Sequence, residues 1–361
     1  MKTKNISINL FTILCFSTIK LLAGCEGGCV SDGGCSWGTL GEEENVIFDF
    51  KEVESYTNMS EDSGNAFSSG TTVHLGLFLY KNPNEAGNYP PLSSEYYLET
   101  SNENVISIDD ILENETYKYV LGMNNEGSAE LIVKKKSDNK VFDSQKFRVA
   151  DPDGIYWYML TPNLESNGEK IFLSSGGNSC IIEFYPYELK NNEKNKLYGS
   201  YHPTIDENCN ANFTISDDSL SPPIQTISIE PSQIETCNLT INGPKNIRES
   251  ISIESISINS VSDIEIQLLE SETPDEYRAG QQTGVTAYQK INSDYICGGF
   301  EIIFSTPTPD IIEIVNQQYG WLGTYTAIIQ FKAPGNGIIT ASLKDNPSLQ
   351  NSINITVQPA Q

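Results

Sequence analysis

The chain has 361 residues, with 22 Lys and Arg against 48 Asp and Glu, and a formal net charge of −26. This acidic excess excludes nucleic acid as a partner, because binding a phosphate backbone needs a basic surface. Hydrophobic residues at 38% and aromatic residues at 10% exclude a disordered acidic tail and indicate a folded protein, long enough for two to four domains of roughly 100–150 residues.

The first 24 residues have the composition of a secretory signal, with Lys2 and Lys4 at the start, then the largely apolar run Ile6–Leu22 and then small residues. Lys20 interrupts the run, which is also short for a bilayer span, so we expect cleavage rather than insertion. The segment Leu22-Ala23-Gly24-Cys25 resembles the bacterial lipobox. This resemblance implies cleavage before Cys25, lipid attachment to its sulfur and fatty acids such as palmitate as the membrane anchor. The alternative is an ordinary secreted protein.

The stretch that follows the signal, residues 25–44, is rich in glycine and acidic residues, and we expect a flexible tether there. Cleavage before Cys25 removes three lysines and no acidic residue, which takes the net charge from −26 to −29. So acidic a body is repelled by anionic lipid headgroups. In the lipoprotein family, aspartate directly after the lipidated cysteine resembles an inner-membrane retention signal. Glu26 stands there instead and favours the outer membrane or the cell surface.

From residue 45 onward, short stretches of alternating apolar and polar residues predict β-strands. In the clearest of them, Val73, Leu75, Leu77 and Leu79 alternate with the residues between them. The other expected strands are 46–50, 129–133, 172–173, 181–184, 224–229, 251–258 and 338–343. Many short strands separated by Gly, Pro, Asn and Asp indicate an all-β fold of sandwiches.

Three sequence anchors recur in the same order in the two halves of the chain. They are Gly70–Lys81 with Gly280–Lys290, Ser101–Ile108 with Ser305–Ile314, and Gly127–Val133 with Gly337–Leu343. This order resembles the bacterial immunoglobulin-like domains of surface proteins. The resemblance implies tandem immunoglobulin-like β-sandwiches.

We expect about three sandwiches behind the signal and the tether, with the middle one divergent. Their expected bounds are 45–150, 151–250 and 251–361, after the signal at 1–24 and the tether at 25–44. Near Asp151-Pro152-Asp153-Gly154, a proline and a glycine stop the preceding strand. Each sandwich is long enough to bury its own core.

Six cysteines remain once Cys15 leaves with the signal and Cys25 is lipidated. They are Cys29, Cys35, Cys180, Cys209, Cys237 and Cys297. An even number in an exported chain predicts three disulfides, of which Cys29–Cys35 would close a short loop. The spacing of Cys180 and Cys237 resembles the inter-sheet bridge of immunoglobulin domains and would leave Cys209 for Cys297. The pairs Cys180–Cys209 and Cys237–Cys297 are an equal alternative.

No catalytic or metal motif is visible, so we predict no enzyme, no cofactor and no metal. His74 falls on the outward side of an expected strand and reads as a solvated residue, and His202 lies in a loop-like segment. The Cys29–Cys35 spacing does not fit zinc. Asp151 and Asp153 would offer calcium two ligands at a domain junction, whereas calcium takes roughly six or more oxygens, so an acidic turn is favoured.

Two aromatic clusters lie in the middle domain, at Tyr156-Trp157-Tyr158 and Phe184-Tyr185-Pro186-Tyr187. Alternation along a strand places Tyr156 and Tyr158 on one face and Trp157 on the other. One face is then core, and rings on the other would stack on sugars. The candidate ligand aromatics are Trp157, Tyr185 and Tyr187.

These patterns favour a non-enzymatic, lipid-anchored protein of the bacterial cell envelope, in which the sandwiches serve as a spacer or an adhesive surface. The alternative is a carbohydrate-binding surface lipoprotein that uses the aromatics of the middle domain. Its partners would be the membrane, through the lipid anchor, and a protein or glycan ligand. An enzyme would need two carboxylates that converge in the middle domain.

Overall fold

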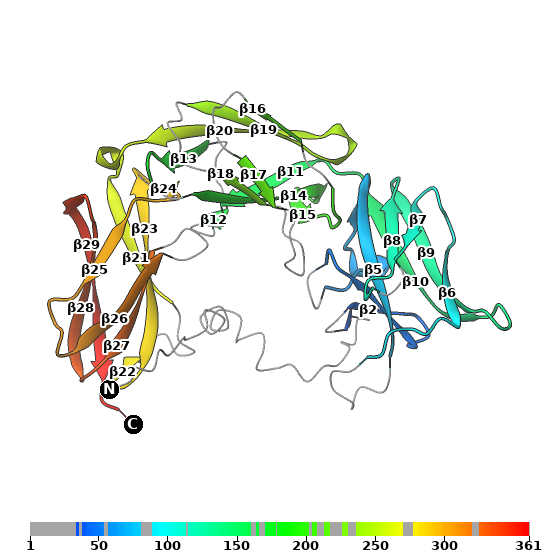
Figure 1. The fold of residues 1–361 in the computed structure, drawn as a ribbon, viewed down its shortest axis with the longest axis horizontal. Helices are drawn as coiled ribbons and strands as arrows, with labels where there is room; N and C mark the ends of the chain where they lie inside the picture. Colours follow the sequence, from blue (N-terminus) through cyan, green and yellow to red (C-terminus); the bar gives the residue numbers. More distant parts are fainter. Residues whose placement is uncertain are drawn as a thin grey trace, which may run out of the picture. The chain divides into compact units, whose positions relative to one another are not determined.

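The chain is built almost entirely of β-strands, as the alternation of apolar and polar residues predicts (Figure 1). The computed structural model describes residues 34–35, 38–53, 57–80, 89–112, 115–159, 164–165, 170–177, 179–201, 204–207, 213–216, 226–229, 236–269, 277–319 and 325–360. In these ranges, no helix has the length and apolar character needed to cross a bilayer. The chain divides into two compact units, Gly27–Ser255 and Ile256–Gln361.

The first unit begins with a two-sheet sandwich. One sheet has the strand order β1-β2-β3-β5-β8-β7. Its strands are β1 (Gly34–Cys35), β2 (Gly38–Leu40), β3 (Val46–Phe50), β5 (Thr71–Leu79), β7 (Ile106–Ile111) and β8 (Tyr119–Met123). The facing sheet has the order β4-β10-β9-β6. Its strands are β4 (Phe67–Ser68), β6 (Tyr96–Thr100), β9 (Gly127–Lys135) and β10 (Val141–Ala150).

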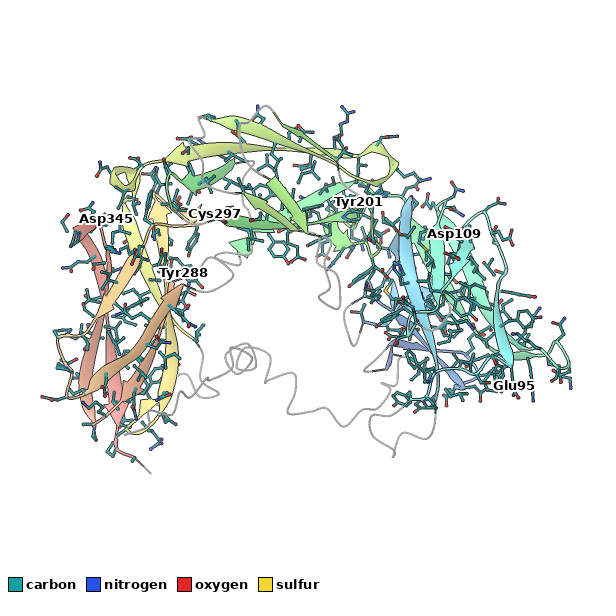
Figure 2. All side chains as sticks on the ribbon, viewed as in Figure 1. Glu95, Asp109, Tyr201, Tyr288, Cys297 and Asp345 are labelled. Carbon is teal, nitrogen blue, oxygen red and sulfur yellow. The ribbon has the colours of Figure 1, made fainter. Side chains whose placement is uncertain are left out.

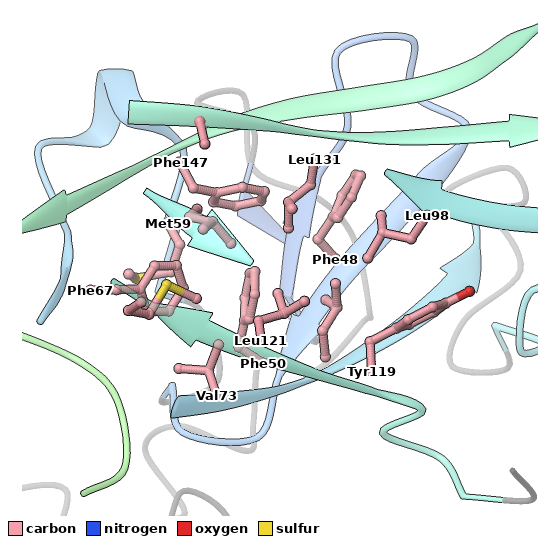
Figure 3. Packing of buried hydrophobic residues seen from close by; sticks show 14 of the residues in the cluster. Phe48, Phe50, Met59, Phe67, Val73, Leu98, Tyr119, Leu121, Leu131 and Phe147 are labelled. Atoms are coloured by element: carbon pink, nitrogen blue, oxygen red, sulfur yellow. The ribbon is translucent and has the colours of Figure 1, made fainter. Parts of the chain in front are cut away.

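The inward side chains of these two sheets form one hydrophobic core (Figure 3). Phe50 lies at its centre, with ring centroids 4.8 Å from Phe67 and 5.1 Å from Phe147. Phe48 meets Phe147 edge-on at 5.6 Å. Because each of these rings is at most 3% exposed, each contributes roughly 1.5–3 kcal/mol by burial.

Part of the expected tether belongs to this sandwich. The strands β1 and β2 lie inside residues 25–44, and β2 pairs with β3 through Leu40 and Ile47. The reason is Asp143, a fully buried residue on the distant strand β10. Its carboxylate accepts the backbone N–H groups of Asn45 at 2.8 Å and Val46 at 2.7 Å. A buried partner about one hundred residues away is invisible to local composition.

Two further sheets complete the first unit. One has the order β12-β11-β14-β18-β17, with β15 added beside β14. Its strands are β11 (Gly154–Met159), β12 (Leu164–Glu165), β14 (Cys180–Lys190), β15 (Glu193–Lys196), β17 (Phe213–Ser216) and β18 (Thr226–Ile229). The other contains β16, β19, β20 and β13 in that order. These strands are β13 (Lys170–Ser174), β16 (Thr204–Glu207), β19 (Cys237–Asn242) and β20 (Arg248–Ile256).

The second unit is again a two-sheet sandwich. One side consists of β21, β23, β27 and β26, and β24 also pairs with β23. These strands are β21 (Asp263–Leu268), β23 (Gln282–Ile291), β24 (Asp294–Cys297), β26 (Ile312–Tyr319) and β27 (Tyr325–Phe331). The other side has the order β22-β29-β28-β25. Its strands are β22 (Tyr277–Arg278), β25 (Ile302–Ser305), β28 (Gly335–Leu343) and β29 (Asn346–Gln358).

The two sandwiches repeat each other strand by strand, which confirms the repeat predicted from sequence. The order β3-β5-β8-β7 corresponds to β21-β23-β27-β26, and β4-β10-β9-β6 corresponds to β22-β29-β28-β25. In both sandwiches, a two-residue strand pairs in parallel with the last strand of the repeat: β4 with β10, and β22 with β29. A β-bulge follows Ile108 in β7 and Ile314 in β26. Bulges that re-aim an edge strand are features of a fold rather than accidents.

The glycines of the anchors show where the sequence alignment holds and where it slips. Gly70 and Gly280 both have positive φ, 77° and 94°, and each donates its N–H to the opposite strand at 2.6 Å. The counterpart of Gly127 is Gly335 rather than Gly337. Gly127 and Gly335 have φ of 144° and 143°, a conformation that glycine tolerates. A slip of two residues preserves the alternation, so the pattern alone does not detect it.

Candidate ligand-binding face

The histidine on β5 is not a simple solvated residue. Nδ1 of His74 lies 2.7 Å from Oε1 of Glu52, and the His74 backbone N–H donates to Oε2 of the same carboxylate at 2.8 Å. Glu52 is 7% exposed, and its hydrogen bond raises the pKa of His74. Burial raises the pKa of nearby Asp49 to about 6. The hydrogen bonds between Glu52 and His74 hold the end of β3 against β5, which gives this pair of residues a structural explanation.

The two carboxylates that follow the first sandwich, Asp151 and Asp153, accept hydrogen bonds from other parts of the chain. Asp151 accepts the hydroxyl of Ser69, and Asp153 accepts the backbone N–H of Leu189 at 2.7 Å. Within the described ranges, no group of three His, Cys, Asp or Glu side chains is placed to hold a metal ion. The two hydrogen bonds that these carboxylates accept fit an acidic turn.

Three of the candidate cysteines, Cys180, Cys237 and Cys297, are disulfide-bonded. Cys25, Cys29 and Cys209 lie outside the described residues, as does His202, and for Cys35 only the backbone is described, in β1. Which cysteine joins which stays a prediction.

The aromatic clusters of the middle region come together on one sheet face. In the antiparallel register of β11 and β14, Tyr156 stands opposite Tyr185 and Gly154 stands opposite Tyr187. Residues opposite each other share a face, so Tyr156, Tyr158, Tyr185 and Tyr187 all point to the same side. We call these four residues the tyrosine face. The ring centroid of Tyr156 lies 5.2 Å from that of Tyr185 and 6.4 Å from that of Tyr158.

The other face of the same strands is core, as alternation predicts. Trp157 is 5% exposed and Phe184 is 1% exposed, so Trp157 is not available to a ligand on the surface. Tyr201, labelled in Figure 2, is 8% exposed and lies on the Phe184 side with its ring centroid 6.3 Å from that of Phe184. Tyr185 and Tyr187, by contrast, are half-buried and keep part of each ring accessible.

Two lysines that the sequence analysis did not single out complete this face. The ammonium of Lys194 lies 5.1 Å from the ring centroid of Tyr156 and 4.9 Å from that of Tyr187. The ammonium of Lys196 lies 5.1 Å from the centroid of Tyr185. Cations within about 6 Å of a ring centroid are held by the negative face of the ring. Each ammonium thus lies against rings of the tyrosine face.

A hairpin brings the lysines there, and its turn has a sequence signal. Asn191 and Asn192 have φ of 54° and 67°, and the flanking residues Lys190 and Glu193 pair across them. Asparagine tolerates the two positive φ values that such a two-residue hairpin turn requires. The Asn-Asn pair could therefore have predicted β15 and, with it, the position of Lys194 and Lys196.

Gly154 makes room for one of the rings. A Cβ atom at Gly154 would lie 2.7 Å from the Tyr187 hydroxyl and 2.9 Å from ring carbons of Tyr187, so this ring lies directly across the backbone of β11. Tyr158 donates its hydroxyl to the Glu183 carboxylate. Burial raises the pKa of Tyr187, and the charges of Glu249 and Asp153 add to that effect. The Tyr187 hydroxyl is a neutral hydrogen-bonding group at physiological pH.

The segment after β15 fastens this sheet to the first sandwich. The backbone carbonyl of Tyr198 accepts the N–H of Ser68 at 2.8 Å, and the Tyr198 N–H donates to the carbonyl of Ala66 at 3.1 Å. The backbones of Thr72 and Ser200 exchange two hydrogen bonds of 2.8 Å. The Tyr198 side chain joins the core of the first sandwich. Arg148 and Glu188 add a charged hydrogen bond of 2.8 Å. We call residues 197–201 the docking segment.

Comparisons with known proteins give fold similarity only. No family model matches the sequence, and no curated protein matches it. The surface layer protein SbsC, domains 4–9, is 13% identical over 92% of this chain and 47% of that chain, with a TM-score of 0.34. The adhesin FdeC of Escherichia coli is 11% identical over 81% of this chain and 94% of that chain, with a TM-score of 0.25.

The adhesin InvE of Yersinia pseudotuberculosis is 11% identical over 52% of this chain and 56% of that chain, with a TM-score of 0.24. The match to the surface layer protein SbsC spans less than half the length of that fragment. At these identities and TM-scores, the similarities say nothing about ligand or activity.

Proposed function

We propose that this chain is a non-enzymatic lipoprotein of the bacterial cell envelope, anchored through Cys25, whose sandwiches act as a spacer or an adhesive surface. The observation that carries the proposal is the repeated sandwich topology behind the lipobox-like segment Leu22–Cys25. A repeated unit that buries its own core needs no partner to fold and extends the chain away from its anchor.

The docking segment supports the spacer role. A flexible linker between the first sandwich and the next sheet would let them move freely. Instead, backbone bonds at Tyr198 and Ser200 join them like neighbouring strands, and Leu197 is buried with Ala66 and Ala150. Backbone pairing together with buried side chains resists bending, and resistance to bending is what a spacer needs.

Surface exposure tests this proposal. Protease added to intact cells should release fragments of residues 45–361 from the wild-type protein while a periplasmic marker stays intact. The Cys25→Ser variant should lose its attachment to the membrane, because the thioether that carries the diacylglycerol cannot form. Full protection of the wild-type chain in intact cells would contradict display at the cell surface.

A second function, carbohydrate binding, is favoured by the tyrosine face. Four half-buried tyrosines on adjacent strands offer flat apolar rings with polar hydroxyls, which suits the apolar faces and hydroxyl edges of sugar rings. Their fixed positions on paired strands lower the entropy cost of ordering them around a ligand. No such cluster was needed for the core, because the opposite face of β11 and β14 already supplies it.

Glycan binding by Tyr185→Ala and Tyr187→Ala variants tests the second function. Each truncation should weaken binding by up to about tenfold, since a contact with an aromatic ring contributes roughly 0.5–1.5 kcal/mol. Tyr97→Ala, which removes a half-buried tyrosine from β6, is the matched control and should bind as the wild type does. Wild-type affinity in both tyrosine-face variants would remove this face from glycan recognition.

A further inference from the structure

We propose that the tyrosine face selects glycans that carry carboxylate groups, such as chains containing uronic acids. The inference rests on the second function above and names the class of glycan. It follows from the position of Lys194 and Lys196, the two cations that lie against the rings a sugar would contact.

A neutral sugar meets an obstacle at this face. To stack on Tyr156 or Tyr187, it has to displace the Lys194 ammonium, which lies 5.1 Å and 4.9 Å from the two ring centroids. The Lys196 ammonium is similarly placed over Tyr185 and over Tyr198, at 5.1 Å and 5.5 Å. Displacement removes the attraction between the cation and the ring. An uncharged ligand offers the displaced ammonium no negative charge in its place.

A sugar that carries a carboxylate replaces the attraction that the lysine ammonium groups lose when they leave the rings. When its ring takes the place of the ammonium over a tyrosine, its carboxylate can accept a charge-assisted hydrogen bond from the same lysine. The lysine side chain is long and flexible enough to move aside while its base stays on β15. Lys194 is exposed, and in the described parts of the chain no carboxylate lies within ion-pair distance of its ammonium.

The acidic groups around the face determine the direction in which a ligand carboxylate points. Glu183 is covered by the Tyr158 hydroxyl, and Glu188 is paired with Arg148. The negative charges of Asp153 and Glu249 also act on Tyr187. A ligand carboxylate is therefore favoured at the β15 side, near Lys194 and Lys196. The net charge of the rest of the chain opposes binding only weakly, because salt screens charges beyond about 8 Å at physiological ionic strength.

A matched pair of probes tests the inference on the full-length protein. Titration calorimetry would compare oligogalacturonate with its methyl ester, which keeps the sugar ring and removes the charge. We expect the acid to bind the wild type at least about tenfold more tightly than the ester. The double variant Lys194→Gln/Lys196→Gln should bind the two forms equally, whereas Lys135→Gln/Lys136→Gln, which changes two exposed lysines of the first sandwich, should behave as the wild type.

The remaining outcomes separate this inference from the function on which it rests. Equal binding of acid and ester by the wild type, with loss of both in Tyr185→Ala, would overturn the charge selectivity and leave glycan binding intact. Binding that survives Tyr185→Ala, or no binding of uronate and neutral oligosaccharides alike, would overturn both. Polyglutamate that binds as tightly, with the same lysine dependence, would show a site for anions rather than for sugars and would also overturn the inference.

Discussion

At the scale of single residues, buried carboxylates organise the first sandwich. Asp143 is fully buried and accepts four backbone N–H groups, from Glu43, Asn45, Val46 and Ser144, at 2.7–2.9 Å. Gly41 lies against the same carboxylate, where a Cβ atom would come within 2.4 Å of it. One side chain thus holds the turn that leads into β3.

Asp143→Ala should destabilise the first sandwich by about 3 kcal/mol or more, because buried N–H groups left without an acceptor cost roughly 1–3 kcal/mol each. Asp143→Asn should cost less, since one amide oxygen keeps part of the acceptor capacity. Urea unfolding of the full chain measures both. Wild-type stability in the alanine variant would show that water or a rearranged turn replaces the carboxylate.

The raised pKa values of Asp49 and His74 predict a pH dependence of the same sign. The folded-state pKa of Asp49 is about 6, above its usual 3.8, so the folded state holds the proton more tightly than the unfolded state. Its contribution to the free energy of unfolding is fully present below pH 3.8 and is lost as the pH rises through about 6. The whole contribution is roughly 3 kcal/mol. The hydrogen bond to Glu52 raises the pKa of His74, and that contribution is lost at higher pH still.

The first sandwich should therefore resist urea better at pH 5 than at pH 8, and Asp49→Asn should reduce the difference. Measurements at these two values avoid the region in which carboxylates with lowered pKa values, such as Glu188 and Glu265, become protonated. An unfolding midpoint that is unchanged or higher at pH 8 would contradict the assignment of the proton to Asp49.

At the scale of elements, alternation predicted the strands well and their partners poorly. The expected strand 46–50 is β3, and 129–133 and 338–343 lie within β9 and β28. These predictions succeeded because one face of each strand is buried, which fixes a period of two. Within the predicted tether at 25–44, the structure instead has β1 and β2, and the counterpart of Gly127 is Gly335 rather than Gly337. Both differences arise because strand partners and register depend on distant residues. Lys194 and Lys196 were missed because β15 is polar and has no apolar alternation, although the Asn191-Asn192 turn marks the hairpin that pairs β15 with β14.

The docking segment depends on a glycine. Gly199 has φ of 131°, and a Cβ atom there would lie 2.1 Å from Oγ1 of Thr71, a buried residue. Gly199→Ala should destabilise the first unit by about 2–4 kcal/mol, from backbone strain and steric overlap together. Gly176→Ala is the matched control, because Gly176 also has positive φ but has no atom within 4 Å of the added Cβ.

Unfolding of the two glycine variants in urea gives the comparison, and hydrogen exchange at the amides of Ser68 and Thr72 reports the docking bonds directly. Gly199→Ala should lose protection at these amides, and Gly176→Ala should keep it. Equal stability loss in both variants would show that only backbone strain matters and that the docking segment tolerates the extra methyl group.

At the scale of the whole molecule, the sandwich repeat and the acidity support the proposed role of an anchored spacer. Two sandwiches share one topology, and the net charge of −26 keeps such a chain soluble and away from anionic headgroups. The sequence predicted this architecture because repeated anchors and alternation are local signals. It named the two aromatic clusters but not their union on one face, which arises only when β11 and β14 pair.

The mass of the mature N-terminal peptide tests the anchoring claim most directly. The account predicts that the first residue is Cys25 and that its peptide carries the added mass of a diacylglycerol, with or without a further acyl group on the amine. An unmodified Cys25, or cleavage at another residue, would contradict it.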